Sequence, residues 1–401
     1  MFAATPIAER SYLIGFIAAL LLSLGLTYLV VRVLSTTNRL GVFVRRRRFS
    51  GKRSAVTFGG LPVVLAFLIV LWSLYFLEYL PANNLALLSV TTLGAVLMLG
   101  LGLADDLLNI RPRTKLAWQV GIVILLYTLG FRVDKIGGWL DLGQWGFVLT
   151  CLWVVGITNS LNLIDGQDGL AGGVILLSAL TLFFFYQERV IFQAPLLAVV
   201  LGGGVLGFLV FNLPPAKITL GDTGSLPLGL LLSLITILPF CQGYSDEIFY
   251  LLPITTLIIP MADTAMAILR RTLRGQNPFA KDTEHFHHKL RKIGLSPAQS
   301  IWVLFAVALY FDLLTLIPAY DINLIPKLIP VFFLVVFGQT TLLILGLRRL
   351  EVNAQREWIR RAWSPQLNVI RQGPEPRKGA APLPVRGLPD RALPQGVRLK
   401  K

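Results

Sequence analysis

The sequence predicts an all-α polytopic membrane protein with about eleven transmembrane helices. Three observations predict this class. Of the 401 residues, 55% are hydrophobic and 14% are charged, whereas about a quarter of the residues of a soluble protein are charged. Apolar stretches long enough to cross a bilayer recur along most of the chain. The Lys and Arg residues gather in alternate loops between these stretches, which is typical of membrane proteins with a fixed orientation.

Eleven apolar stretches have the length of a membrane span, which takes about 20 helical residues. The first is longer than the apolar part of a cleaved signal peptide, so we interpret it as a retained helix. The stretches comprise approximately residues 11–34, 60–78, 85–104, 116–130, 145–158, 170–186, 194–211, 225–240, 248–269, 299–317 and 327–347.

The basic residues orient these helices. The odd-numbered loops and the C-terminal tail hold nearly all of the 37 Lys and Arg residues. Because Lys and Arg are enriched on the cytoplasmic side, we predict that the odd loops and the C-terminus are cytoplasmic and the N-terminus is outside. This distribution accounts for the net charge of +16 without a nucleic-acid partner. The exceptions are Arg10, Arg132, Lys135, Arg189 and Lys327.

The loops and the tail differ in character. The run Arg45–Arg48 is typical of a segment beside anionic lipid, a role that can coexist with phosphate binding. Residues 131–144 alternate apolar and polar positions around two glycines, which predicts a small periplasmic hairpin. We divide the chain into a transmembrane domain with the candidate catalytic residues, 1–348, and a basic cytoplasmic tail, 349–401. The tail begins as an amphipathic segment and continues with a composition typical of disorder.

A polar, glycine-rich island at 159–173 interrupts the apolar pattern. Asn159, Asn162, Asp165 and Asp168 follow one another at intervals of three residues. If the backbone is helical there, residues three apart share a face, so these four side chains can point into one space. Because buried charge without partners is costly, the island must face water or a ligand. The alternative interpretation is a short solvated loop.

Two further motifs carry adjacent or glycine-flanked acids. Asp105 and Asp106 adjoin at a predicted helix end, and Lys115 follows them. Two carboxylates so close repel each other unless a cation intervenes. Asp222 follows a glycine in a turn that opens a helix, where backbone amides can bind phosphate. Taken alone, the first motif is also typical of a helix cap or a solvated pair.

A fourth motif holds all three histidines of the chain, His285, His287 and His288. Histidine at this spacing on a basic stretch suits phosphate contact, although such a cluster alone is also typical of an amphipathic helix. All four motifs fall in odd-numbered loops, and their joint presence on one side predicts a shared active site.

The residue types indicate the chemistry. Hard oxygen ligands favour Mg²⁺, with Mn²⁺ as the alternative, over zinc, and two cysteines exclude a disulfide scaffold or an all-cysteine metal site. Acids, Lys and His around such a metal are typical of phosphoryl transfer. At the membrane surface, a soluble nucleotide and a lipid phosphate can meet. The alternatives are a secondary transporter, which places acids near the bilayer midplane, and a non-catalytic scaffold.

The motifs GLADDLLNIRPRTKL, NSLNLIDGQDGLAGG, LGDTGSLPLG and PFAKDTEHFHHKL resemble those of the polyprenyl-phosphate N-acetylhexosamine-1-phosphate transferases, in the same order between about residues 35 and 295. The HxHH form is similar to the UDP-GlcNAc branch. The resemblance implies transfer of N-acetylhexosamine-1-phosphate, above all GlcNAc-1-phosphate, from a UDP-sugar to undecaprenyl phosphate with release of UMP. Phospho-MurNAc-pentapeptide transfer is the alternative within the family. The implied location is the inner (plasma) membrane, with the site on the cytoplasmic face.

The resemblance also implies roles for individual residues. The implied metal ligands are Asp222, Asp105 and Asp106. The implied catalytic residues are Asp105, Asp106, Asp222, His287 and His288. The implied substrate-binding residues are Asn159, Asn162, Asp165, Asp168, His285 and Lys115. Asp263 matches a family acid in the ninth span, with helix packing as the alternative role. The implied partners are a UDP-N-acetylhexosamine, undecaprenyl phosphate and a second copy of the chain.

Overall fold

A computed structural model describes residues 6–36, 48–49, 53–54, 57–136, 140–187, 193–242, 254–275 and 285–316. All of them belong to one compact unit, Met1–Leu347. The predicted tail and the predicted span 327–347 lie outside the described residues. The longer helices in this part of the chain are α1 (Pro6–Thr36), α2 (Gly60–Phe76), α3 (Leu85–Leu108), α4 (Pro112–Thr128), α5 (Trp145–Ile164), α6 (Leu170–Gln187), α7 (Gln193–Asn212), α8 (Asp222–Cys241), α10 (Ile258–Leu273) and α12 (Pro297–Leu316).

The short elements complete this description. A 3-10 helix, η2 (Ala82–Asn84), precedes α3, and the one-turn to two-turn helix α11 (Phe286–Lys292) precedes α12. Two antiparallel pairs of strands are present, β1 (Arg48–Phe49) with β2 (Arg53–Ser54), and β3 (Lys135–Ile136) with β4 (Leu140–Asp141). The second pair confirms the hairpin predicted between the fourth and fifth spans.

The described helices confirm a predominantly helical, multi-pass membrane protein. Seven of them are long and apolar enough to cross a membrane, namely α1, α3, α5, α6, α7, α8 and α12. The shorter apolar helix α2 has 17 residues. Each of these eight helices falls on a stretch that the hydropathy pattern predicted, because about 20 apolar residues in a helix match the thickness of the bilayer core.

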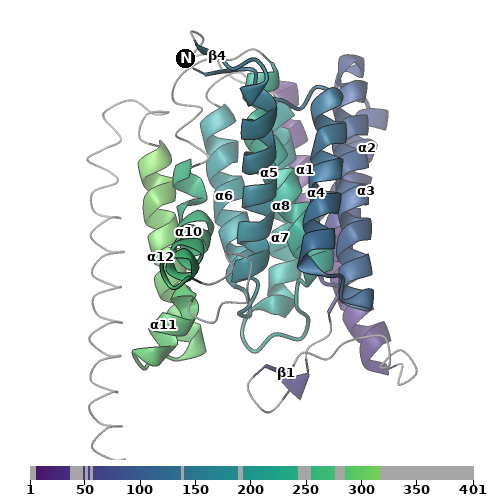
Figure 1. Cartoon of the computed structure of the whole chain (residues 1–401). Helices are drawn as coiled ribbons and strands as arrows, with labels where there is room; N and C mark the ends of the chain where they lie inside the picture. The colour runs from purple at the N-terminus through teal and green to yellow at the C-terminus, as the bar shows by residue number, and fades with distance from the viewer. Residues whose placement is uncertain are drawn as a thin grey trace, which may run out of the picture. The chain divides into compact units, whose positions relative to one another are not determined.

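Helices α7 and α8 form the centre of the bundle (Figure 1). In the most apolar part of each, 83% of α7 and 89% of α8 is buried, against 22% of α1. Helix α8 packs mainly on α3, α5 and α2, and also contacts α6 and α7, whereas α7 packs mainly on α1 and α6. A helix that is apolar all round and buried on all sides belongs to the interior of a bundle. Asp222, the first residue of α8, therefore lies at one end of the bundle but is buried among the neighbouring helices.

Glycines let α2 and α3 contact the first turn of α8 directly. A Cβ atom at Gly60 would overlap the Cα atom of Gly224, and one at Gly102 would overlap the carbonyl oxygen of Asp222. The backbone N–H of Gly60 also donates to the carbonyl of Leu220 over 3.1 Å. Backbone contact at this distance is possible only without a side chain, so these glycines determine where α8 begins relative to α2 and α3.

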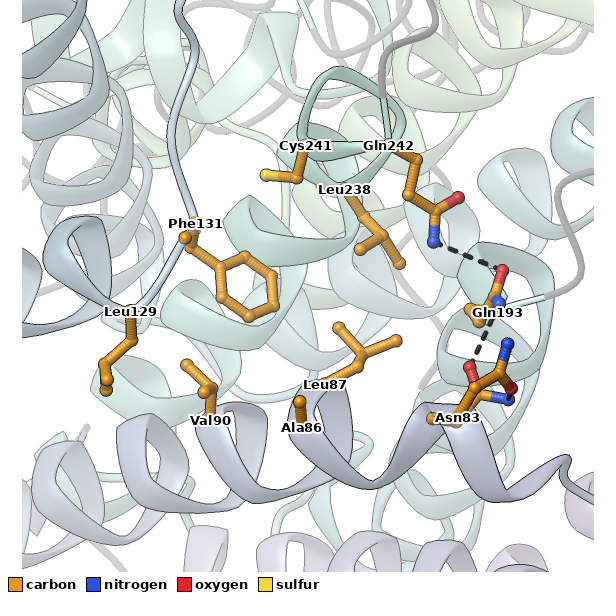
Figure 2. Close-up of a pocket in the computed structure, with 12 residues that line it drawn as sticks. Asn83, Ala86, Leu87, Val90, Leu129, Phe131, Gln193, Leu238, Cys241 and Gln242 are labelled. Carbon is orange, nitrogen blue, oxygen red and sulfur yellow. Dashed lines mark hydrogen bonds between the residues drawn. The ribbon is translucent and has the colours of Figure 1, made fainter.

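At the opposite end of α3 and α8, a cavity of about 280 Å³ is lined by residues of α3, α7, α8 and the segment after α4. Figure 2 shows its polar wall. Gln242 Nε2 donates to Gln193 Oε1 over 3.2 Å, and Gln193 Nε2 donates to Asn84 Oδ1 over 3.0 Å. These carboxamides satisfy one another and connect α8, α7 and η2, so this end of the bundle is held together by neutral hydrogen bonds.

The close contact between α3 and α8 predicts that Gly102→Ala lowers the thermal stability of the purified protein. The added methyl group must displace the Asp222 carbonyl, and overpacking of this kind costs about 1–3 kcal/mol. The matched control is Gly100→Ala on the same helix, where an added Cβ meets nothing within 4 Å. Since alanine is the better helix former, Gly100→Ala should keep or raise the melting temperature. Equal melting temperatures for the two variants would contradict this packing.

Candidate functional site

Three helix ends bring two acids and a lysine together at one side of the bundle. Lys115, in the first turn of α4, places its Nζ atom 2.6 Å from Asp222 Oδ2 and 3.0 Å from Asp105 Oδ2. The side chains of Lys115, Asp105 and Asp222 are 18%, 13% and 9% exposed. The two carboxyl groups also lie within hydrogen-bond range of each other. The cation between them offsets part of the repulsion between two adjacent buried carboxylates.

The lysine is held in its charged form by this arrangement. Burial lowers the pKa of Lys115, but the carboxylates of Asp222 and Asp105 outweigh burial and hold that pKa above its ordinary value. The ammonium group is therefore charged throughout the physiological pH range. The side chain of Asn162, at the end of α5, lies beside Asp222. Residues of α3, α4, α5 and α8 thus meet at one charged cluster.

Asp106, next to Asp105, has a different set of partners. Its Oδ1 atom accepts the N–H of Asp222 over 3.2 Å, and its Oδ2 atom accepts the N–H of Thr223 over 2.9 Å and the Thr223 hydroxyl. These amides are the first of α8, where an anion is stabilised by unpaired N–H groups and by the helix dipole. Gly221, with φ +71°, permits this contact, because a Cβ there would lie 2.8 Å from Asp106 Oδ2. Both Asp106 oxygens are used in holding α8.

Asp165 and Asp168 bind the segment that leads into α8. Asp165 Oδ2 accepts the N–H of Gly221 and Asp168 Oδ2 accepts the N–H of Ala216, each over 3.1 Å. Asn212, the last residue of α7, binds the same loop, since its Oδ1 atom accepts the N–H of Gly169 over 2.9 Å. The loop after α5 and the loop before α8 therefore form one hydrogen-bonded unit.

The four-residue face predicted at the polar island does not form as a single helical face. Asn159 and Asn162 lie in α5, but the helix ends at Ile164, and Asp165 is its C-cap residue with φ −71° and ψ 30°. Asp168 follows in a turn. The helical spacing does not continue beyond Ile164. The carboxylates of Asp165 and Asp168 instead accept hydrogen bonds from the backbone N–H groups of Gly221 and Ala216. Tertiary contacts, not helical spacing, bring Asn162 and Asp165 to the N-terminus of α8.

Two polar residues of the site region were not singled out by the sequence. Gln119 on α4 is fully buried, and its Oε1 accepts Asn159 Nδ2 over 2.7 Å. Asn212 ends α7 and also donates its Nδ2 to the carbonyl of Ile218 over 2.7 Å. The available signal was an uncharged amide inside or at the end of an apolar span, which usually has a hydrogen-bonding partner.

The histidine motif is supported from α10. His285 precedes α11, and its Nδ1 atom lies 3.0 Å from Asp263 Oδ2. The rings of His285 and His288 have centroids 6.3 Å apart. Burial, the neighbouring His285 and Arg291 lower the pKa of His288, so its ring is neutral at pH 7. The side chain of His287 lies outside the described residues.

Of the three predicted metal ligands, Asp105 and Asp222 are better placed for a divalent cation than Asp106 is. Within the part of the chain that the structure describes, no group of three or more His, Cys, Asp or Glu side chains is arranged to hold a metal ion. Asp105 and Asp222 nevertheless converge on one point, which the Lys115 ammonium occupies. Hard carboxylate oxygens suit Mg²⁺ or Mn²⁺, and these two could hold such an ion once the ammonium moves aside. Asp106 remains committed to α8.

Comparisons with known proteins agree on one kind of enzyme. The family model described as glycosyl transferase family 4 matches residues 88–239. A probable undecaprenyl-phosphate N-acetylglucosaminyl 1-phosphate transferase from Bacillus subtilis is 35% identical over 268 residues, covering 65% of this chain and 74% of the relative. A decaprenyl-phosphate N-acetylglucosaminephosphotransferase from Mycobacterium tuberculosis is 31% identical over 339 residues, covering 76% and 81%. A phospho-N-acetylmuramoyl-pentapeptide-transferase from Thermotoga maritima is 30% identical over 319 residues, covering 76% and 97%.

The contacts of Asp106 predict a difference between two substitutions. Asp106→Asn leaves one acceptor oxygen for three donors, and each hydrogen bond to a charged group contributes about 1.5–3 kcal/mol. Thr223→Val removes only the hydroxyl donor and keeps both amide contacts. Thermal unfolding of the purified variants should therefore show a larger loss of stability for Asp106→Asn. A Thr223→Val protein that is equally or more destabilised would contradict the capping role of Asp106.

Proposed function

Because the chain belongs to the polyprenyl-phosphate N-acetylhexosamine-1-phosphate transferases of glycosyl transferase family 4, we propose that it transfers GlcNAc-1-phosphate from a UDP-sugar to undecaprenyl phosphate. The products are UMP and a lipid-linked sugar diphosphate for a cell-envelope polysaccharide. The observation that carries this proposal is the Lys115 ammonium held between the carboxylates of Asp222 and Asp105 at three helix ends. Opposite charges at one point are the groups that a metal-bound diphosphate requires.

In the proposed reaction, Asp222 and Asp105 would hold Mg²⁺, and the metal would supply positive charge to the diphosphate and to the departing UMP. Lys115 donates charge-assisted hydrogen bonds from its ammonium group to phosphate oxygens. A phosphate oxygen of the lipid acceptor attacks the phosphorus that carries the sugar, and the bond from that phosphorus to the UMP oxygen breaks. One carboxylate of the pair positions the acceptor phosphate or takes its proton. His287 and His288 contact phosphate or sugar.

The nucleotide is proposed to lie against the unit formed by the loops after α5 and before α8. Support comes from the hydrogen bonds of Asp165 to Gly221 and of Asp168 to Ala216, which make this wall rigid. Asn162 connects the wall to Asp222. A rigid wall beside the charged cluster orients a bound substrate at low entropic cost.

The choice of GlcNAc follows the names of the Bacillus subtilis and Mycobacterium tuberculosis relatives. The second candidate is phospho-MurNAc-pentapeptide transfer. It is supported by the Thermotoga maritima relative, which this chain matches over 97% of the relative's length. Both candidates use the same bond changes and differ in the sugar nucleotide. A panel of UDP-sugars therefore separates them.

We also propose the finer topology, with eleven spans, the N-terminus outside, the C-terminus in the cytoplasm and the site on the cytoplasmic face of the inner membrane. The ends of α3, α4, α5 and α8 that carry the charged cluster face the basic loops in this arrangement. The β3–β4 hairpin follows α4 at its other end, which is the outer side. A boundary between a catalytic domain, 1–348, and a basic tail belongs to the same proposal.

The proposed function predicts UMP release from UDP-GlcNAc by the purified protein, with undecaprenyl phosphate and Mg²⁺ both required. Asp222→Asn should abolish release, because the substitution removes a charge from the cation site. The matched control is Asp134→Asn, which alters an acid in an ion pair with Arg132 (2.8 Å) at the hairpin end of α4 and should keep wild-type turnover. Release by Asp222→Asn at the wild-type rate would overturn the assignment, and release from another UDP-sugar alone would redirect the substrate.

Competition between Lys115 and a divalent cation predicts a second, activity-independent result. In EDTA, Lys115→Gln should melt below the wild type, because two carboxylates then face each other without a cation. Added Mg²⁺ should raise the melting temperature of this variant more than that of the wild type, since no ammonium must be displaced. Lys217→Gln, at a lysine 5.9 Å from the Phe211 ring, serves as the control. Equal Mg²⁺ shifts in all three proteins would show that Lys115 does not occupy the cation position.

A further inference from the structure

An aspartate of α10 binds the start of the histidine helix through both of its carboxylate oxygens. Asp263 Oδ2 lies 3.0 Å from His285 Nδ1, and Asp263 Oδ1 accepts the backbone N–H of Phe286 over 3.0 Å. The exposed fractions of Asp263 and His285 are 1% and 5%. A carboxylate buried to this degree and bonded twice to one segment determines the position of that segment.

The contact also determines which ring nitrogen of His285 carries hydrogen. An ionised carboxylate only accepts hydrogen bonds, so the partner atom Nδ1 must be the protonated nitrogen. The Nε2 atom then keeps its lone pair in the neutral ring and is the atom with which His285 can bind other groups. Asp263 thus sets the tautomer of His285 as well as its place.

Helix α11 depends on this contact because it is short. It spans seven residues, Phe286–Lys292, and its first backbone hydrogen bond runs from the N–H of Lys289 to the carbonyl of His285. An isolated helix of this length is not stable in water. It packs against α12, its Phe286 and Leu290 side chains contact the hydrophobic core, and Asp263 holds its first residue. His288 lies one turn after His285, with the two rings 6.3 Å apart, so a shift of His285 moves both rings.

We infer that Asp263 is a positioning residue for the transfer reaction, which fixes the Nδ1–H tautomer of His285 and the start of α11 and thereby orients the His285–His288 pair. This inference rests on the proposed function in one respect, because it takes the histidines to contact the phosphate or sugar of the substrate. Through its contacts with His285 and Phe286, Asp263 couples the position of α11 to that of α10. Helix α10 in turn packs against α5 and α12. Asp263 itself does not touch the substrate.

The first test reads the tautomer directly, without turnover. The chain has only three histidines, so ¹⁵N-histidine labelling of the untagged protein in lipid bilayers gives three resolvable ring patterns. In the wild type, the His285 ring, identified by its absence in His285→Ala, should carry its proton on Nδ1. In Asp263→Asn the amide can keep the Phe286 contact through its oxygen, but its NH₂ group donates to Nδ1, so the His285 proton should move to Nε2.

The matched control for this measurement is Asp312→Asn. Asp312 is an equally buried aspartate, 1% exposed, on the neighbouring helix α12. All three histidine patterns should remain as in the wild type in this variant. A wild-type His285 protonated on Nε2 alone, or an Asp263→Asn protein with an unchanged pattern, would overturn the inference.

The second test separates positioning from general structural support by a double-mutant cycle. With UDP-GlcNAc and undecaprenyl phosphate, Asp263→Asn should lower kcat by about tenfold or more with a smaller change in KM and a melting temperature close to that of the wild type. Adding Asp263→Asn to His285→Ala should cause no further loss, because the aspartate acts through that ring. If the loss of kcat in the double variant equalled the product of the losses in the two single variants, the inference would be overturned. If Asp263→Asn moves the His285 proton but the wild-type protein releases no UMP from any UDP-sugar, the contact between Asp263 and His285 is supported and the proposed function is overturned.

Discussion

The ion pairs of Lys115 with Asp222 and Asp105 are the constraint on which the rest of the site depends. Two buried carboxylates at the ends of α3 and α8 repel each other, and a cation between them offsets part of that repulsion. The first turn of α4 supplies that cation at 2.6 and 3.0 Å. Each of the three helices is therefore held at the end that carries its charge. With both carboxylates ionised, the three side chains carry a net charge of −1, which a divalent ion in place of the ammonium would neutralise.

The beginning of α8 explains why so many acids surround one glycine turn. Asp106 and Asp165 accept the amides of Gly221, Asp222 and Thr223 from two directions. Four N–H groups at a helix start have no partner within the helix, and here acids from α3 and from the loop after α5 provide acceptors. The acids around this turn thus divide into two groups. Asp106 and Asp165 hold the backbone at the start of α8, whereas Asp105 and Asp222 share Lys115.

The histidine helix belongs to a separate support. Asp263 connects it to α10, while the charged cluster is built on α3, α4, α5 and α8. The histidine helix is therefore positioned by other helices than those that build the charged cluster. At the other end of the bundle, neutral hydrogen bonds join the carboxamides of Asn84, Gln193 and Gln242.

The sequence by itself determined the helical membrane class, the position of most spans and the hairpin of β3 and β4, because hydropathy and alternation are local and follow the rise per residue of helix and strand. It also identified the four polar motifs. Only the tertiary structure decided that Lys115 lies between Asp105 and Asp222, that Asp106 caps α8, that Asn159 turns to Gln119 rather than sharing a face with Asp168, and that Asp263 holds His285. These contacts join residues up to 117 positions apart, and their geometry depends on how helix ends meet in space, which no periodicity within one segment encodes.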